Sequence, residues 1–300
     1  MTGVPTTQRP TGSFAVRAAR TVRRRSVLSG AMIALTYTAA ILAMVPLVLI
    51  LGYLIVKGAG AISLDFFTQM PRPVGDPGGG MANAIVGTLI LVGVASAIGL
   101  PIGIGAGLYL AEYRTSRLAT LVRFLSDVLN GLPSIVMGIF AWQILVRPFG
   151  KFSAMAGGVA LGAMMIPLVT RTTEEMVRTV PNTLREAALA LGYPQWRVSL
   201  TIVLRTALAG IVTGALVAVA RIAGETAPLL FTALGNNFWS TSLWEPIAAL
   251  PLQIFTYANT PYDEWRTLAF GGALVLIAII LIISIVARLV TGRRHAGGGD

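Results

Sequence analysis

The sequence predicts an all-α integral membrane protein with six transmembrane helices. Of its 300 residues, 55% are hydrophobic and only 12% are charged, and the mean hydropathy is +0.77. Soluble domains carry about twice that share of charge. The chain also contains six long apolar runs separated by polar segments. Because a helix of about 20 apolar residues crosses a bilayer, each run is long enough to span it.

Composition also excludes several other classes. The net charge of +11 does not indicate nucleic-acid binding, because the arginines cluster in short loops and at the termini. Such a distribution is typical of a membrane protein whose basic loops stay in the cytoplasm. The chain has no cysteine and a single histidine, His295, in a glycine-rich tail. We therefore predict no disulfide and no metal site.

The N-terminal part is predicted to contain a basic arm and one spanning helix. Residues 1–25 combine Pro, Thr, Gly and Ser with several arginines, so we expect a disordered cytoplasmic arm. The uncharged run at residues 26–56 is about twice as long as the apolar part of a signal peptide. We interpret residues 26–83 as a retained first transmembrane helix followed by an external loop.

Five further spans are expected at residues 81–111, 118–146, 154–170, from about 202 to beyond 228, and 267–287. They form one membrane domain, residues 84–288, ahead of a cytoplasmic tail at 289–300. The second span is rich in glycine, and small residues let membrane helices pack closely. In the third span, Arg123 and Asp127 are four residues apart and can pair on one helical face.

The loop between the fourth and fifth spans, residues 180–205, is polar and charged and is predicted to form two short helices. Thr183 can cap the first helix in a capping box with Glu186, and Gly192 can end it. One apolar face follows the helical repeat, formed by Leu184, Ala187, Ala188 and Leu191. The two alanines keep this face flat, which suits insertion into the groove of a partner protein.

The fifth span contains the candidate residues for a substrate path. Arg221 and Glu225 are four residues apart, and charged groups inside a span are costly unless they pair or line a wet cavity. Arginine suits an oxyanion, because its planar fork offers two parallel donors. Glu225 can hold the fork when the site is empty, and Thr226 adds a hydroxyl. A purely structural ion pair is the alternative.

The distribution of arginine and lysine predicts the orientation in the membrane. The N-terminal arm, the loop after the second span, the 180–205 loop and the tail hold most of these residues. The positive-inside rule places these segments, and therefore both termini, in the cytoplasm.

The 180–205 loop has a distinctive spacing: Glu186, Ala187 and Ala188, then Gly192, then an Ile-Val-Leu run that ends at residue 204. This spacing resembles the EAA loop of ABC-importer permeases, although Arg205 stands where that pattern has a proline. Further segments, NGLPSIVMGIFAW, GETAPLLFTA and LPLQIF, resemble the PstA-type permeases of bacterial phosphate importers.

The resemblance implies a MetI-like permease fold and a non-catalytic subunit of an ATP-driven phosphate importer in the bacterial plasma (inner) membrane. Its implied partners are a homologous PstC-like permease, two copies of a PstB-like ATPase and an external PstS-like phosphate-binding protein. Glu186, Ala187, Ala188 and Gly192 would then couple the chain to the ATPase. No cofactor is expected in this chain, since it lacks a phosphate-binding P-loop and ATP would bind to the partner subunits.

Three alternatives remain open from the sequence. A related importer could carry another oxyanion, such as sulfate or molybdate. A gradient-driven secondary anion transporter would also place charges in a span, but such folds often contain inverted repeats and we find no convincing repeat here. A membrane-embedded enzyme is disfavoured, because the spans lack histidine and offer only Asp127 and Glu225 as acids.

Overall fold

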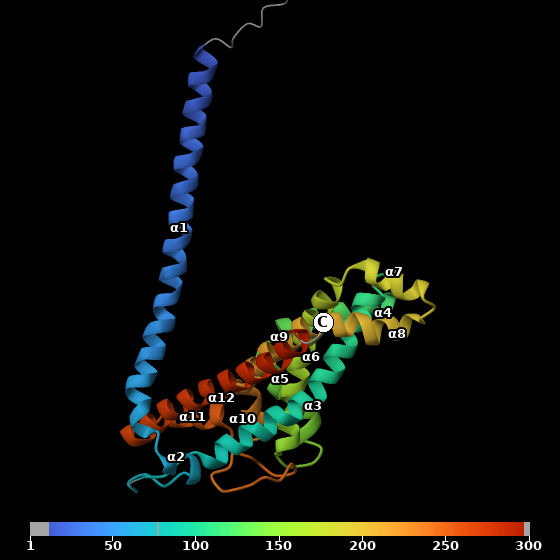
Figure 1. Ribbon diagram of the computed structural model, residues 1–300. Helices are drawn as coiled ribbons and strands as arrows, with labels where there is room; N and C mark the ends of the chain where they lie inside the picture. The colour runs from blue at the N-terminus through green and yellow to red at the C-terminus, as the bar shows by residue number, and fades with distance from the viewer. Residues whose placement is uncertain (1–11, 77, 297–300) are drawn as a thin grey trace, which may run out of the picture. The chain divides into compact units, whose positions relative to one another are not determined.

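The computed structural model describes residues 12–76 and 78–296 of the chain (Figure 1). The chain divides into two compact units, residues 1–53 and 54–300. The first unit consists of most of α1 (Gly12–Gly58), a continuous helix with Pro46 in its interior. Residues 12–25 are therefore helical rather than disordered, while residues 1–11 of the predicted arm lie outside the described residues. Alanine and arginine are strong helix formers, which explains why α1 begins before its apolar part.

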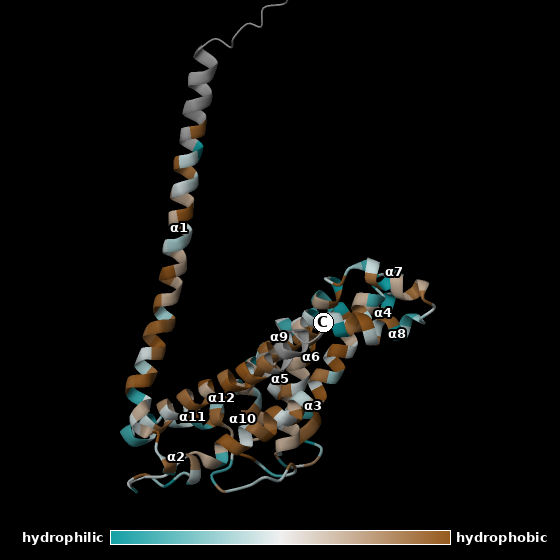
Figure 2. Cartoon of the chain, viewed as in Figure 1, coloured by the Kyte–Doolittle hydropathy of each residue, from teal (hydrophilic) through white to brown (hydrophobic). Residues whose placement is uncertain are grey.

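The second unit is helical in nearly all its elements. Its α-helices are α2 (Leu64–Thr68), α3 (Ala82–Glu112), α4 (Arg117–Gly131), α5 (Ser134–Ala141), α6 (Ala154–Arg178), α7 (Asn182–Ala190), α8 (Gln195–Arg197), α9 (Leu204–Ala223), α10 (Ala227–Thr232), α11 (Leu250–Ala258) and α12 (Asp263–Ala296). Short helical segments of other types are η1 (Ala59–Ala61), η2 (Trp142–Val146) and η3 (Val198–Val203). Figure 2 shows hydrophobic residues along most of α3 and α12.

The number of spans agrees with the prediction only if one of them is broken. Among the described residues, five helices are long and apolar enough to cross a membrane, and a sixth span requires counting α4 and α5 with η2 as one. These two parts meet at a bend of 107°. The third span predicted over residues 118–146 therefore consists of two helices that meet at this bend. Pro133 explains the break, because a proline cannot continue the helix that ends at Gly131.

Other predicted boundaries shift for similar reasons. The fourth span does not stop at residue 170, since α6 continues to Arg178. The fifth span does not run through Pro228: α9 ends at Ala223 and α10 is a separate short helix. The helix of the sixth span, α12, covers Asp263–Ala296, and its membrane-crossing part begins at Asp263 and ends at Val286, close to the predicted residues 267–287.

Close packing of α3 on α6 forms the centre of the second unit. A Cβ atom at Gly103 would lie 2.7 Å from Cβ of Val169, and one at Gly107 would lie 2.5 Å from the carbonyl oxygen of Thr170. Only glycine allows this approach, as the glycine-rich pattern of the second span predicted. Leu91 belongs to the buried cluster that continues from these helices into α9, α10 and α11.

The second unit has two different ends (Figure 1). α7 and α8 form one end, while α2 and the long connection between α10 and α11 lie at the other. The residues predicted for ATPase coupling, which lie in and just after α7, are therefore at the opposite end of the unit from the connection between α10 and α11.

Candidate functional site

The predicted two-helix loop is present at one end of the second unit. α7 and α8 are separated by a turn in which Gly192 adopts a φ of +83°, a left-handed conformation that favours glycine. Pro194 caps α8 and directs the chain into η3. The predicted capping box is wrong: Pro181, not Thr183, precedes the helix, and no side chain caps it. Proline has a fixed φ suited to this position, so α7 begins without a side-chain cap.

The apolar face predicted on α7 is divided between two environments. Ala188 is only 4% exposed and packs with Val177, Val198 and Val203 of the same chain. Leu184 and Leu191 are exposed, as are Glu186 and Ala187. Ala188 therefore attaches α7 to its own chain, while the other predicted coupling residues remain accessible to a partner. A single outward face of four residues is not what the structure shows.

Arg185 anchors α7 to two long helices. Its guanidinium forms an ion pair with Glu112 at the end of α3 and donates a hydrogen bond to the carbonyl oxygen of Val177 in α6 at 3.2 Å. The two charged side chains are only 16% and 10% exposed. No spacing along the sequence predicts this contact, because Glu112 and Arg185 are 73 residues apart, although both stand in charged segments next to predicted spans. Because the pair is largely removed from water, α7 is held to α3 and α6 by a charge-assisted contact.

A second group of charges lies between α4 and α6. Glu174, which is 8% exposed, accepts from Arg123 at 2.7 Å and also pairs with Arg178. Asp127 pairs with Arg171 at 3.2 Å. The predicted Arg123–Asp127 pair is therefore wrong. Each of the two residues instead pairs with a residue of α6, so the interactions join two helices instead of stabilising one.

The predicted substrate-path residues lie where α9 ends. Arg221 is exposed in the last turn of α9, and Glu225 and Thr226 are partly buried in the break before α10. Within the described residues, the Arg221–Glu225 ion pair that we predicted is absent, and neither side chain has another ionic partner. The helix stops at Ala223, so the four-residue spacing no longer places both charges on one face. Thr226 donates a hydrogen bond to the carbonyl oxygen of Pro251 in α11 at 3.4 Å.

Comparison with known proteins identifies the family. A model for the inner membrane component of binding-protein-dependent transport systems matches residues 99–295. The chain is 49% identical over 249 residues to the phosphate transport system permease protein PstA of Yersinia pestis, covering 83% of this chain and 84% of that protein. It is 36% identical over 272 residues to PstA 1 of Mycobacterium tuberculosis strain H37Rv, covering 89% of this chain and 88% of that protein.

Solved structures agree with this result at the level of the fold. A bacterial alginate ABC transporter in complex with its alginate-loaded periplasmic protein has a TM-score of 0.64 at 13% identity, covering 94% of this chain and 99% of that chain. The inward-facing MetNI methionine ABC transporter has a TM-score of 0.57 at 19% identity, covering 70% and 92%. The predicted MetI-like permease fold is therefore confirmed. The chain belongs to the family of inner membrane components of binding-protein-dependent transport systems, and within it to the PstA permeases.

Proposed function

We propose that this chain is the permease subunit of an ATP-driven importer that moves inorganic phosphate into the cytoplasm. The observation that carries the proposal is the similarity to PstA permeases, which covers more than four fifths of the chain. The chain supplies the membrane path and the contact to the ATPase. ATP would bind to two PstB-like subunits, so this subunit would need no cofactor of its own and would have no catalytic residues.

The remaining partners follow from the same proposal. A homologous PstC-like permease would enclose the path together with this chain, and a PstS-like binding protein would deliver phosphate from outside. The orientation predicted from the basic loops, with both termini in the cytoplasm of a bacterial inner membrane, places α7 and α8 on the ATPase side. The connection between α10 and α11 then faces the binding protein.

The arrangement of α7 supports its role as the coupling helix of an EAA-type loop. Glu186, Ala187 and Leu191 are exposed, whereas Ala188 is packed against the chain's own core and Arg185 is paired with Glu112. A push on the exposed face would therefore move the ends of α3 and α6, because Arg185 contacts both helices. Gly192 ends α7 before the chain turns into α8.

Glu186→Lys is expected to weaken ATPase binding by at least about tenfold, equivalent to ~1.4 kcal/mol. Glu186 is exposed and forms no ion pair within the described part of the chain, so the change reverses a surface charge without disturbing the fold. Binding of the purified ATPase to the permease pair, measured by surface plasmon resonance, checks this result. Glu264→Lys, at the opposite end of the unit, is the matched control; equal binding by both variants would contradict the coupling role of α7.

For the substrate path, Arg221→Ala is expected to reduce ATP-dependent uptake of labelled phosphate into proteoliposomes at least tenfold, the effect of losing about 1.4 kcal/mol of binding to a charged donor. Arg221→Lys keeps the charge but loses the planar fork, and is expected to retain an intermediate rate. The complete assembly is reconstituted, and its ATPase activity reports that the subunits have assembled.

Sulfate serves as competitor in the same experiment. Inhibition of phosphate uptake by equimolar sulfate would favour an importer for a broader class of oxyanions. Full uptake by Arg221→Ala would remove this residue from the path, and uptake that does not depend on ATP would contradict the proposed function itself.

A further inference from the structure

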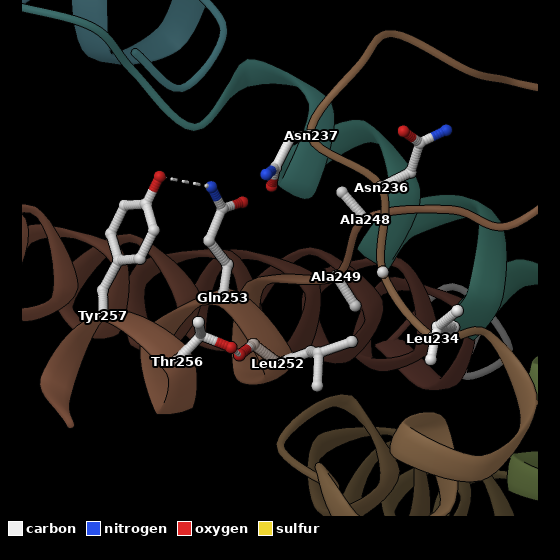
Figure 3. A pocket seen from close by; sticks show the side chains of 10 residues that line it. Leu234, Asn236, Asn237, Ala248, Ala249, Leu252, Gln253, Thr256 and Tyr257 are labelled. Atoms are coloured by element: carbon white, nitrogen blue, oxygen red, sulfur yellow. Dashed lines mark hydrogen bonds between the residues drawn. The ribbon is translucent and has the colours of Figure 1, made fainter. Parts of the chain in front are cut away.

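A polar cavity of about 240 Å³ lies between the connection after α10 and one face of α11 (Figure 3). Its volume is several times the ~30 Å³ that one water molecule occupies in the liquid, so a small hydrated anion fits. The side chains of Asn236, Asn237, Gln253, Thr256 and Tyr257 line it. All are neutral hydrogen-bonding groups. The Asn236 amide already donates to the carbonyl oxygen of Pro246 and accepts from the N–H of Phe238, and the Thr256 hydroxyl donates to the carbonyl oxygen of Leu252. Burial raises the pKa of the Tyr257 phenol above its ordinary value, so this group also stays neutral at physiological pH.

Gln253 is the residue of this cavity whose hydrogen bonding is incomplete. It is 8% exposed, and its Nε2 donates to the Tyr257 hydroxyl at 3.2 Å, while its Oε1 is buried and has no partner in the part of the chain that the structure describes. Figure 3 shows this oxygen on the side of the amide that faces Asn237. A buried amide group without a partner is costly, which points to a ligand that completes it.

The amide of Gln253 can serve a ligand in either orientation. A phenol hydroxyl both donates and accepts, so Tyr257 can also donate to Oε1 and leave the amide N–H₂ directed to the cavity. In one orientation the cavity presents an acceptor, and in the other it presents a donor. A ligand that has both P–OH and P–O⁻ groups matches both orientations. Inorganic phosphate keeps a proton at neutral pH, whereas sulfate keeps none.

The cavity carries no charge that opposes an anion. It follows α11 from Ala249 and Leu252 in the cap and first turn to Thr256 and Tyr257 in the last turn, so the two ends of the helix dipole offset each other along it. Among the lining residues there is no carboxylate that would favour a cation instead.

One hydrogen bond links the wall of the cavity to the break after α9. Pro251, next to Leu252 in the cavity wall, accepts it from Thr226, which follows Glu225. Arg221, Glu225 and Thr226 themselves do not line the cavity.

We propose that this cavity is an entry site for inorganic phosphate at the external end of the permease, with the Gln253 amide as its central contact. The proposal rests on the proposed import function and adds the position of a binding site: the anion is held by neutral groups around Gln253 and Asn237. Neutral donors hold an anion without binding it as tightly as an arginine, which suits a site that must release its ligand inward.

The test measures phosphate binding directly. The purified complete assembly in detergent, without the binding protein, is placed in equilibrium dialysis with labelled inorganic phosphate. Gln253→Leu, which keeps the size of the side chain, is expected to weaken binding about tenfold. Asn237→Leu, on the exposed connection, is expected to weaken binding several-fold and serves if the buried substitution prevents assembly. Gln143→Leu, at an exposed glutamine of η2, is the matched control and should bind as the wild type does.

Three results would overturn the proposal: wild-type assembly that binds no phosphate, unchanged binding in both cavity variants, or equally tight binding of sulfate. ATP-dependent uptake with the binding protein present separates this failure from failure of the import function. If uptake is specific for phosphate while the cavity variants bind normally, only the cavity site is wrong. If no phosphate is taken up by the wild type, the proposed function is wrong as well.

Discussion

Arg185→Ala is expected to lower the stability of the α7 attachment by about 3–5 kcal/mol, since Glu112 would remain buried without its partner. In the wild type, the Arg185 guanidinium pairs with Glu112 of α3 and donates to the carbonyl oxygen of Val177 in α6. Both side chains of the pair are mostly buried, so solvent screens the interaction far less than it screens a surface pair. The expected functional result is ATP hydrolysis with at least tenfold less phosphate uptake per ATP consumed.

Two further variants separate coupling from general damage. Exchange of the charges by Arg185→Glu with Glu112→Arg is expected to restore part of the uptake per ATP, but not the bond to Val177. Arg266→Ala removes an exposed pair with Asp263 at the opposite end, and a surface pair contributes only about 0–1 kcal/mol. The ratio of uptake to ATP hydrolysis is measured for each. A wild-type ratio in Arg185→Ala would show that α7 transmits motion without this contact.

The sequence predicts those features of the fold that depend on local chemistry. Apolar runs of sufficient length identify the long helices, and the glycines of the second span predict that it packs closely on a neighbouring helix, which the structure shows to be α6. The end of α7 at Gly192 was predictable as well, because glycine adopts the left-handed conformation that ends a helix more readily than other residues do. Pro133 carries the corresponding signal for the break in the third span, but the length of the run from residue 118 to 146 equally fits one continuous helix.

The partners of charged residues could not be predicted in the same way. Arg123 pairs with Glu174 and Asp127 with Arg171, over separations of 51 and 44 residues. Spacing along one helix favours local pairs, but the packing of α4 on α6 brings other partners closer. The pairing of Arg221 with Glu225 fails for a different reason. A pair four residues apart needs a continuous helix, and α9 ends at Ala223. The cavity at Gln253 forms because the long connection after α10 folds back on α11. No periodic pattern in the sequence predicts the path of that connection.

Gly107→Leu is expected to be the most damaging single change in the centre of the second unit. A Cβ at this position would lie 2.5 Å from the carbonyl oxygen of Thr170 and 2.6 Å from Cβ of Thr173. The first of these contacts is with backbone, so no side-chain rotation relieves it and α3 must move away from α6. Overpacking costs about 1–3 kcal/mol in adaptable cores, and more is expected where two helix backbones meet.

Gly105→Leu is the matched control for this change, because it adds the same side chain to the same helix two residues away. A Cβ at Gly105 meets no atom of the described chain within 4 Å. Thermal unfolding of the detergent-solubilised assembly should show a lower midpoint for Gly107→Leu and a midpoint near that of the wild type for Gly105→Leu. Equal midpoints for the two variants would mean that the α3–α6 approach is not essential. A lower midpoint for Gly107→Leu alone would show that Gly107 holds α3 against α6. These are the two helices that Arg185 of α7 contacts, through Glu112 and the carbonyl oxygen of Val177.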